Sequence, residues 1–595
     1  MSDAIRETAS RAASRAAPEW CRLAALAELR GDGPFALSAS GRDIVVVRTA
    51  EGLRAYDGRC PHQGALLGEG ELEGGALVCR NHRWRFSPES GRRLGGPQCL
   101  AAHRVERRGD DLWIEVGAPP LEPFASSRSG LRDIAGLPHK PNLPLLGNVL
   151  QLDLGRLHEI LEGWAREFGG PFTYRVGPFR VVALADASLS EQVLRARPET
   201  FRRASTLEPI FQEIGVAGVF SAEGSEWRGQ RKLAMQALSH RHLRGFYPTL
   251  AATLHRLRAR WEAKARAGAV LDIADELKRF TVDTTTMLVL GHDVNTIGAD
   301  DDVIQRKLEH VFPALNRRLF ALLPTWRWFR TPADRRLDRA VAELRVWLRT
   351  LLEAARARLA ADPARAANPQ NFLESMVAAR DAEDRPFPDE VIFGNLLTML
   401  LAGEDTTAYT LAWAVHHLAD SPDAVARLRA EADAVLQDRA APDDIEAVHR
   451  LAYAGAVANE TMRLRPVAPL LLFEANHDTA VGDIAVPQGQ WVMLLMRPPA
   501  VDGSHFGEPA AFRPERWLDA AAAAGAHEPS THMPFGSGPR ICPGRSLALT
   551  EMKLLLAMLY ASFDVERVGA GTEVREAFAF TMSPVGLRVR LHRRR

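Results

Sequence analysis

Two groups of potential metal ligands stand out in this 595-residue sequence, one near its beginning and one near its end. Cys60 and His62 lie in one short segment, and Cys79 and His82 lie in a second segment after an interval of 16 residues. Thiolate sulfur and imidazole nitrogen bind both zinc and iron–sulfur clusters. The four residues therefore predict a metal site, and their types alone leave a tetrahedral zinc site and a two-iron cluster as alternatives.

The second group is a single cysteine in a glycine-rich turn. Cys542 lies in the segment FGSGPRICPG, and the run SLALTEMKLLLAMLY that follows has the apolar period of a helix. This order predicts that the sulfur lies at a helix N-terminus, where free N–H groups and the helix dipole favour the thiolate form. A thiolate in such a turn is a candidate iron ligand.

The segments around the first group favour iron over zinc. YDGRCPHQGALLGEG and VCRNHRWRFSPESG resemble the Rieske domain, and the resemblance extends over about 100 residues, from residue 20 to residue 117. It implies a [2Fe-2S] cluster in which Cys60 and Cys79 hold one iron while His62 and His82 hold the other.

The resemblance also indicates which kind of Rieske cluster to expect. High-potential respiratory versions have a second cysteine in each loop, and a Ser and a Tyr that donate hydrogen bonds to the cluster and its ligands. The corresponding positions here are Ala65, Asn81, Trp84 and Phe86. Fewer hydrogen bonds to sulfur stabilise the reduced cluster less, so we expect a low-potential, ferredoxin-type electron donor.

The loop around Cys542 is similar to the haem loop of the cytochrome P-450 family, FxxGxRxCxG, at every defined position. The matching residues are Phe535, Gly538, Arg540, Cys542 and Gly544. The resemblance covers about 460 residues, from GLPHKPNLPLLGN to the C-terminal TMSPVGLRVRL. It implies haem b as a cofactor, with Cys542 as the axial thiolate ligand of the iron.

Two further motifs of the same family follow in the expected order. NETMRLRP contains Glu460 and Arg463, which lie three residues apart on one helix face, and FRPERW contains Arg516. The resemblance implies that these three side chains form a structural network beneath the haem. Such a buried network is costly to break once its charges are paired.

A third group of residues is expected to hold the haem propionates. Trp227 and Arg231 resemble the helix that donates hydrogen bonds to one propionate, and Arg540 would supply a second charge-assisted contact. For Trp227 alone, ordinary core packing is the alternative. The sequence departs from the family at Phe473, five residues before Asp478, where many members have a basic propionate partner.

A long helix is expected from Asp389, as its N-cap, to about Asp420. Its middle reads LLAGEDTTAYT, in which Asp405 and Thr406 occupy the acid–alcohol positions of the family motif AGxDT. Their implied role is to deliver protons to iron-bound oxygen. The alternative is that Thr406 and Thr407 only donate hydrogen bonds to carbonyl groups of their own helix.

The family resemblance also predicts the residues around the substrate. They are nearly all apolar, which favours a lipophilic small molecule without a fixed charge, and ordinary core packing is the alternative for each of them. The predicted pocket residues are Phe211, Ile214, Phe220, Met399, Ala402, Leu471 and Thr581.

The composition excludes some other classes of function. The sequence has 75 basic and 74 acidic residues, so no overall positive charge is present to bind nucleic acid. No uncharged apolar run reaches the roughly 18 residues of a transmembrane segment. Five cysteines in so long a chain favour a reducing compartment, and we expect a cytoplasmic protein in which Cys21 and Cys99 are free thiols.

Two unequal domains must position these sites. Residues 18–117 contain short alternating strands and predict a small all-β domain, whereas residues 135–595 predict a large, mostly α (α+β) domain of the cytochrome P-450 type. Residues 118–134 are rich in Pro and Ser and predict a flexible linker that lets the first domain swing against the second. The expected fold class is therefore multidomain.

The leading hypothesis is a monooxygenase that receives electrons through its own cluster. Because the sequence has no GxGxxG dinucleotide fingerprint, we expect a separate NAD(P)H-dependent flavin reductase to reduce the cluster, which then reduces the haem for reaction with O2. One alternative is a Rieske non-haem oxygenase, but the downstream residues carry haem motifs instead of a further iron site. Another alternative is a haem-based redox or gas sensor. The presence of the acid–alcohol pair, Asp405 and Thr406, argues against a sensor.

Overall fold

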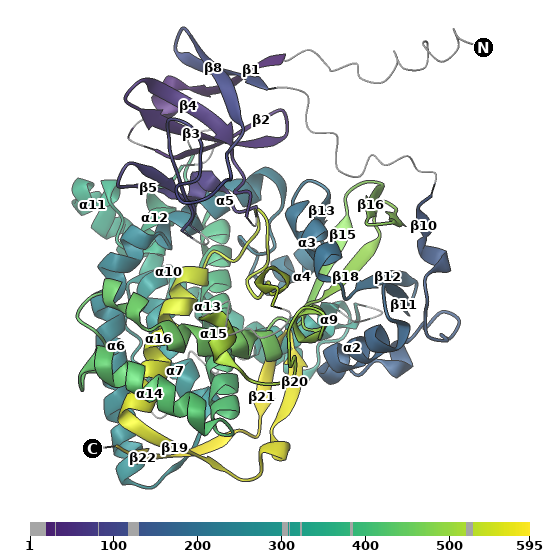
Figure 1. Ribbon diagram of the computed structural model, residues 1–595, viewed down its shortest axis with the longest axis vertical. Coiled ribbons are helices and arrows are strands. Elements are labelled where there is room, and N and C mark those ends of the chain that lie inside the picture. Colours follow the sequence, from purple (N-terminus) through teal and green to yellow (C-terminus); the bar gives the residue numbers. More distant parts are fainter. Residues whose placement is uncertain are drawn as a thin grey trace.

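The computed structural model describes residues 19–594 with the exception of 30, 32, 63, 81–82, 117–129, 300–306, 309, 320, 322–323, 381–384 and 519–526. The described residues form two parts (Figure 1). An N-terminal part built of strands lies against one end of a larger, mainly helical part. The expected order, an all-β domain followed by a mostly α domain with strands, is confirmed.

The N-terminal part contains a six-stranded antiparallel sheet in the order β1-β9-β8-β4-β3-β2. Its strands are β1 (Glu19–Ala25), β2 (Phe35–Ala39), β3 (Arg42–Thr49), β4 (Gly52–Asp57), β8 (Ala102–Arg108) and β9 (Asp111–Val116). A second, three-stranded sheet consists of β5 (Glu71–Glu73), β6 (Ala76–Val78) and β7 (Arg85–Phe86).

Strand β3 separates two small cores, because successive side chains of a strand point to opposite faces of its sheet. Ile44 and Val46 pack in a cluster with residues of β9. Val45 and Val47 pack in a second cluster, which contains both cysteines of the first predicted metal site. The main sheet is therefore the support on which the small sheet and the metal-binding loops rest.

Helices dominate the larger part. They are α2 (Leu157–Phe168), α3 (Ala187–Arg195), α4 (Leu207–Ile214), α5 (Gly224–Ala237), α6 (His240–Arg266), α7 (Ile273–Leu290), α9 (Val311–Leu319), α10 (Pro332–Ala361), α11 (Pro363–Ala367), α12 (Phe372–Ala378), α13 (Asp389–Leu418), α14 (Pro422–Leu436), α15 (Ala452–Leu464) and α16 (Arg545–Ser562). In the described part of the chain, none of the helices combines the length and apolarity needed to cross a bilayer.

The strands of the larger part form small sheets at its margins. The largest has the order β11-β12-β18-β15-β13. The strands are β10 (Arg132–Asp133), β11 (Phe172–Val176), β12 (Phe179–Leu184), β13 (Phe201–Arg203), β14 (Val270–Asp272), β15 (Leu470–Ala475), β16 (Thr479–Val481), β17 (Ile484–Val486), β18 (Trp491–Leu495), β19 (Phe563–Val568), β20 (Arg575–Ala579), β21 (Thr581–Val585) and β22 (Arg588–Arg593).

Helix α13 runs through the middle of the larger part (Figure 1) and contacts α7, α15 and α16. Two apolar clusters meet on it, and Met399 packs against both. A helix that is apolar on most sides is typical of the interior of a large domain. Gly403 permits the close approach of α7, because a Cβ atom there would lie 2.5 Å from Oγ1 of Thr285.

Two expected boundaries differ from the structure. Pro388 is the N-cap of α13 and Asp389 is its first residue, so the N-cap prediction is wrong by one position. The carboxylate still lies in the first turn, where the helix dipole favours negative charge. Most of the expected linker lies outside the described residues, but Arg132 and Asp133 pair in parallel with β17. The end of that segment is thus anchored to the larger part.

Candidate functional site

The first metal-binding loop is a tight turn closed by main-chain hydrogen bonds. The N–H of Cys60 donates to the carbonyl of Ala65 at 2.8 Å, and the N–H of Gly64 donates back to the carbonyl of Cys60 at 2.8 Å. Gly64 has φ +68°, a conformation that favours glycine. The turn buries the Cys60 side chain in the core and leaves the imidazole of His62 at its edge.

The second loop repeats this pattern. The N–H of Cys79 donates to the carbonyl of Trp84 at 2.7 Å, and the N–H of Arg83 donates to the carbonyl of Cys79 at 2.9 Å. Arg83 has φ +57° at the position equivalent to Gly64 in the first loop. His82, the expected fourth ligand, and Asn81 lie outside the described residues. The two loops are therefore structural equivalents that each present one cysteine to the same core.

The donor set and its surroundings fit a [2Fe-2S] cluster. Two thiols buried in one apolar core, with an imidazole at the edge, are three of the four side chains that a Rieske cluster needs. The ring of His62 stacks on Trp84 at 4.5 Å between centroids, so an aromatic group occupies the position of a hydroxyl donor. Phe86 is fully buried in the same core. The hydroxyl of Tyr56 is engaged with the carbonyl of Pro88.

The haem loop also positions its cysteine through the main chain. The N–H of Cys542 donates to the carbonyl of Phe535 at 2.9 Å, and Gly536 and Gly538 have φ +77° and +75°. Gly544 is the N-cap of α16, and its N–H hydrogen-bonds to the Cys542 sulfur, which lies at the helix N-terminus as the sequence predicts. Burial raises the pKa of the Cys542 thiol, whereas this N–H and nearby arginines oppose that effect.

The three residues of the expected structural network are brought together beside this loop. The guanidinium of Arg463 makes two hydrogen bonds of 2.8 Å to the carboxylate of Glu460. Arg516 donates to the same carboxylate at 3.0 Å, and the indole of Trp517 donates at 2.9 Å. Glu460 and Arg463 are fully buried. Sequence reasoning missed Trp517, which follows Arg516 directly in FRPERW.

The residues expected to hold the haem propionates differ in their partners: Arg540 and Trp227 contact residues of the larger part, whereas Arg231 pairs with the N-terminal part. Arg540 lies over the ring of Trp227 at 4.4 Å, and its Nη2 pairs with Glu223. Arg231 instead forms a two-point ion pair with Glu69 of the N-terminal part, at 2.9 and 3.1 Å. Its remaining donor bonds to the carbonyl of Ile541 at 2.7 Å. Arg231 therefore links the two parts of the chain in this structure.

A residue that sequence reasoning missed lies beside Arg540. The side chain of Arg197 is 3% exposed, and its Nε and Nη2 have no hydrogen-bond acceptor among the described residues. Its guanidinium stacks on Phe473, 4.3 Å from the ring centroid. Phe473 is the position at which the sequence departs from the family. Arg197 thus brings a positive charge to the neighbourhood of the absent basic residue.

The charges around Arg197 fit an anionic group. Burial lowers the pKa of Arg197 well below its ordinary value, and the neighbouring Arg203 and Arg540 lower it further. Burial also lowers the pKa of Arg203 to about 9 and that of Arg540 to about 10, with Glu223 as the opposing carboxylate. Because a guanidinium stays charged in proteins, such a cluster requires more negative charge than Glu223 supplies. Haem propionates have the right charge and hydrogen-bonding chemistry.

The acid–alcohol pair lies in the middle of α13. The carboxylate of Asp405 pairs with Nζ of Lys278 on α7 at 3.6 Å. The hydroxyl of Thr406 donates to the carbonyl of Ala402 at 2.9 Å, which is the local hydrogen bond that the sequence analysis gave as an alternative. Its oxygen lone pairs can still accept a proton donor. The neighbouring Thr407 hydrogen-bonds instead to Glu551, whose pKa burial raises to about 8.

The predicted substrate residues occupy several environments. Phe211, Ile214 and Phe220 belong to an aromatic and aliphatic cluster, in which the rings of Phe211 and Phe220 stack at 5.5 Å. Ala402 on α13 is exposed, Leu471 lies in β15 of the largest marginal sheet, and Thr581 begins β21. Phe580 contacts both phenylalanine rings.

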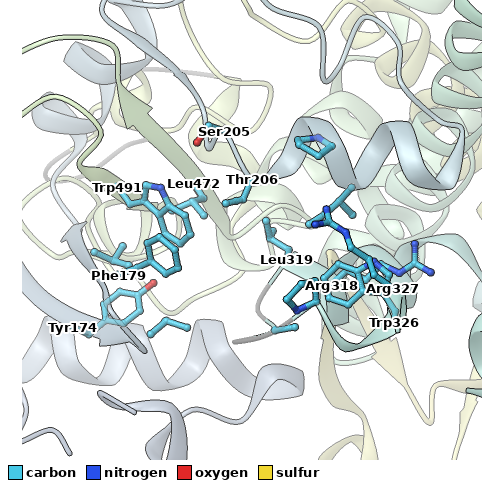
Figure 2. A pocket seen from close by; sticks show the side chains of 16 residues that line it. Tyr174, Phe179, Ser205, Thr206, Arg318, Leu319, Trp326, Arg327, Leu472 and Trp491 are labelled. Atoms are coloured by element: carbon cyan, nitrogen blue, oxygen red, sulfur yellow. The ribbon is translucent and has the colours of Figure 1, made fainter. Parts of the chain in front are cut away.

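A pocket of about 380 Å³ lies next to this cluster, between β12, α4 and α9 (Figure 2). None of the seven predicted residues lines it. Its walls include Ile210, Leu472 and Trp491, and Arg318 and Arg327 reach it from one side (Figure 2). Four aromatic rings and several aliphatic side chains line the pocket, which suits an apolar molecule, and the Arg318 charge is paired with Asp334 at 3.3 Å.

Comparison with known families decides the identity of the larger part. The model of the family described as cytochrome P450 matches residues 137–589. The chain belongs to the cytochrome P-450 family. The model of the Rieske [2Fe-2S] domain matches residues 19–106, so this cytochrome P-450 is fused to a Rieske domain. Haem and a [2Fe-2S] cluster are therefore its cofactors.

Curated relatives resemble the chain over most of its length. Human "25-hydroxyvitamin D-1 alpha hydroxylase, mitochondrial" is 29% identical over 80% of this chain and 94% of its own. Rice "Cytochrome P-450 714D1" is 27% identical over 74% of this chain and 78% of its own. The "self-sufficient cytochrome P-450 monooxygenase CYP505E4" of Penicillium expansum is 26% identical over 77% of this chain and 43% of its own. This cytochrome P-450 is an oxidoreductase, a haem-thiolate monooxygenase.

Proposed function

We propose that this cytochrome P-450 oxidises a lipophilic, uncharged small molecule with electrons that pass through its own Rieske cluster. A separate NAD(P)H-dependent flavin reductase supplies two electrons, one at a time. With two protons, they reduce one oxygen atom of O2 to water, while the other oxygen atom enters a C–H bond of the substrate and gives an alcohol. If the protein were instead a haem-based redox or gas sensor, no such alcohol would form.

The observation that carries the proposal is the contact between the two iron-binding loops. A Cβ atom on Gly64, two residues after His62, would lie only 3.2 Å from Cα of Gly538 in the haem loop. It would also lie 3.0 Å from Nε of Arg195. The loop that holds a cluster ligand therefore packs main chain to main chain against the loop that holds Cys542. This is the arrangement that short-range electron transfer between two iron sites needs.

The other residues have supporting roles in this proposal. When bound, the haem supplies oxygen activation, which thiolate ligation favours. Asp405, which pairs with Lys278, exchanges protons with solvent. The hydroxyl oxygen of Thr406 accepts a hydrogen bond from the group that donates the proton to oxygen. Arg197 and Arg540 fix the propionate end of the haem. The five cysteines favour a reducing compartment, and we propose the cytoplasm.

The direct test of the proposal is reductase-dependent product formation. The holoenzyme, a flavin reductase and NAD(P)H are incubated with a library of terpenoids, fatty acids and alkyl aromatics, and hydroxylated products are sought by mass spectrometry. We expect an uncharged lipophilic compound to give a product carrying one atom from labelled O2. If every compound only alters the haem spectrum while no product forms, the sensor hypothesis replaces this one.

Replacing Thr406 with Ala is expected to uncouple oxygen reduction from product formation. The variant loses the hydroxyl that holds a proton donor, while Cys542 and the helix remain unchanged. Reductant oxidation will continue, product formation will fall by about tenfold or more, and hydrogen peroxide will account for the difference, since proton delivery of this kind typically contributes 10²–10⁴-fold.

Thr410→Ala is the matched control for Thr406→Ala, because its hydroxyl donates to the carbonyl of Thr406 one turn further along α13 and is buried. It removes the same atoms from the same helix, away from Ala402. The ratio of hydrogen peroxide to product, measured for the two variants in parallel, tests whether Thr406 takes part in proton delivery. Equal ratios in both variants would show that Thr406 has no role in proton delivery.

Replacing Arg197 with Leu is expected to weaken haem retention. A hydrogen bond between a guanidinium and a carboxylate is typically worth 1.5–3 kcal/mol, so loss of haem to an acceptor such as apomyoglobin will accelerate by about tenfold or more. Arg197→Lys will restore part of the retention. Arg202→Leu is the control, because Arg202 pairs with Glu208 at 3.1 Å. Unchanged haem loss from Arg197→Leu would exclude Arg197 as a propionate partner.

A further inference from the structure

The two domains meet along a surface rich in ion pairs. The N-terminal domain lies over the end of α3, over α5 and over the haem loop, on the side that carries Cys542 (Figure 1). We call this side of the larger domain its proximal face. Ion pairs across the contact are Arg231 with Glu69 at 2.9 Å, Arg59 with Glu199 at 3.1 Å and Arg228 with Asp43 at 3.1 Å.

Arg80 makes the deepest contact across this surface. It directly follows the cluster ligand Cys79 in the chain. Its Nη1 donates to the carbonyl of Met235 at 3.1 Å, and its Nη2 donates to the carbonyls of Leu238 and Pro543, the latter at 3.0 Å. All three acceptors belong to the larger domain. Pro543 directly follows Cys542, so the residue after the cluster ligand Cys79 is bonded to the residue after the haem ligand Cys542.

The position of these acceptors explains why a cation is held here. Met235 and Leu238 lie at the C-terminal end of α5, where the last carbonyl groups have no partner within the helix. A positive charge is favourable at this end of the helix dipole. Partial burial at the contact lowers the pKa of Arg80 to about 10, because removal from water disfavours the charged guanidinium. Arg80 thus caps a helix that belongs to the other domain.

We propose that Arg80 locks the Rieske domain onto the proximal face, so that the two iron-binding loops form a permanently docked pair and no second electron donor reaches that face. This inference rests on the proposed relay through the cluster and deepens it. The sequence analysis expects instead a linker that lets the Rieske domain swing. A domain held by Arg80 delivers each electron without a docking step.

Two of the three neighbouring ion pairs are weaker candidates for this role, whereas the third, between Arg231 and Glu69, is buried and assists Arg80. The side chains of Arg59 and Arg228 are 35% and 39% exposed, so water and salt screen their attraction to carboxylates. Arg80 is bound by main-chain carbonyl groups, which carry no counter-charge that salt can replace. We therefore expect docking in the natural protein to persist at high ionic strength, and to depend on salt only after Arg80 has been changed.

The first test follows hydrogen exchange in the holoenzyme. Arg80→Gln removes the charge and shortens the side chain, and Arg107→Gln, which makes the same change, is the matched control, because Arg107 is exposed on β8. Amides of residues 235–240 and 59–70 will exchange about tenfold faster or more in Arg80→Gln, the loss expected for charge-assisted hydrogen bonds. In Arg107→Gln they will exchange as in the natural protein. Natural protection in Arg80→Gln would overturn the proposal.

The second test separates docking from the relay itself. The cluster is reduced first, and reduction of the haem is then followed by stopped flow at low and high salt, in protein whose cluster and haem spectra are intact. In Arg80→Gln, haem reduction will slow by about tenfold and become salt-dependent. An unchanged, salt-independent rate would overturn the lock. If the natural protein itself transfers no electron to its haem, the proposed relay fails, whereas the exchange data still report on docking.

The third test uses an added soluble ferredoxin as the probe of the proximal face. In His62→Ala, which lacks the cluster, this donor will not reduce the haem, because the Rieske domain still covers Pro543 and its neighbours. In the double variant His62→Ala, Arg80→Gln, the same donor will reduce it. Equal haem reduction in the single and double variants would show that Arg80 does not close this face.

Discussion

Replacing Cys542 with Ser will abolish both turnover and the carbon monoxide spectrum that is characteristic of thiolate-ligated haem. Serine preserves the size of the side chain and the hydrogen bond from the Cys542 N–H to Phe535, so the haem loop will keep its conformation. A hydroxyl oxygen does not push electron density onto the iron as a thiolate does, and this push favours O–O cleavage. We expect product formation to fall below detection.

Cys99→Ser is the matched control for this variant. Cys99 is an exposed cysteine whose sulfur hydrogen-bonds to the main-chain carbonyls of Ser90 and Leu100. Spectrum and turnover will survive this change. The reduced carbon monoxide difference spectrum of purified, haem-loaded protein is the measurement. A thiolate-type band in Cys542→Ser would exclude Cys542 as the axial ligand.

Replacing His62 with Ala is expected to disconnect the haem from the reductase without damaging the haem site. The variant loses a ligand of the cluster, so reductase-driven turnover will collapse. Cys542, Asp405 and Thr406 are unchanged, and turnover supported by added peroxide, which needs no electron donor, will survive together with the carbon monoxide spectrum. Both activities are measured on one preparation whose iron and haem contents are known.

His103→Ala serves as the control, since His103 is a histidine of the same domain that bonds to Asp57 at 2.8 Å, away from the metal-binding loops. It will keep its cluster and its reductase-driven activity. Full reductase-driven activity in cluster-free His62→Ala would show that electrons reach the haem by another route. The Rieske domain would then have a structural or regulatory role instead.

The metal-binding loops and the haem loop were predictable because their chemistry is local. Cys60 and His62 come from one turn, and the glycines around Cys542 precede a helix whose apolar period is continuous. The long helix α13 was predictable for the same reason, and its bounds differ from the expected ones by two residues or fewer. Spacing and periodicity suffice where a site is built from residues that are close in the chain.

The partners of long polar side chains were not predictable in this way. Arg231 matches a family pattern for propionate binding, yet it reaches Glu69, which lies 162 residues earlier in the chain. Arg231 can pair with Glu69 only because the Rieske domain lies on the proximal face. This contact is a property of the fusion and not of the motif. Arg197 was missed although the departure at Phe473 pointed to a displaced charge.

The substrate pocket was the least predictable feature. The predicted wall residues follow a family pattern, but side chains such as Phe211 and Phe220 pack against one another. The pocket that the structure contains lies beside them and is lined by residues of β12 and of the segment after α9 (Figure 2). The stacking of aromatic rings depends on contacts between segments that are far apart in the sequence. A local sequence pattern does not predict such contacts.

The three acceptors of Arg80 have a consequence for the biosynthesis of this protein. Ribosomes make the Rieske domain first, but Pro543 follows Arg80 by 463 residues. At 5–20 residues per second, roughly 25 to 90 seconds pass before the docking surface is complete. During that time the nascent Rieske domain has its main sheet and its own two cores, but nothing covers the guanidinium of Arg80 or the edge that carries His62. The first domain therefore docks only after the haem loop has emerged, and the newly made cluster site is accessible to assembly factors until then.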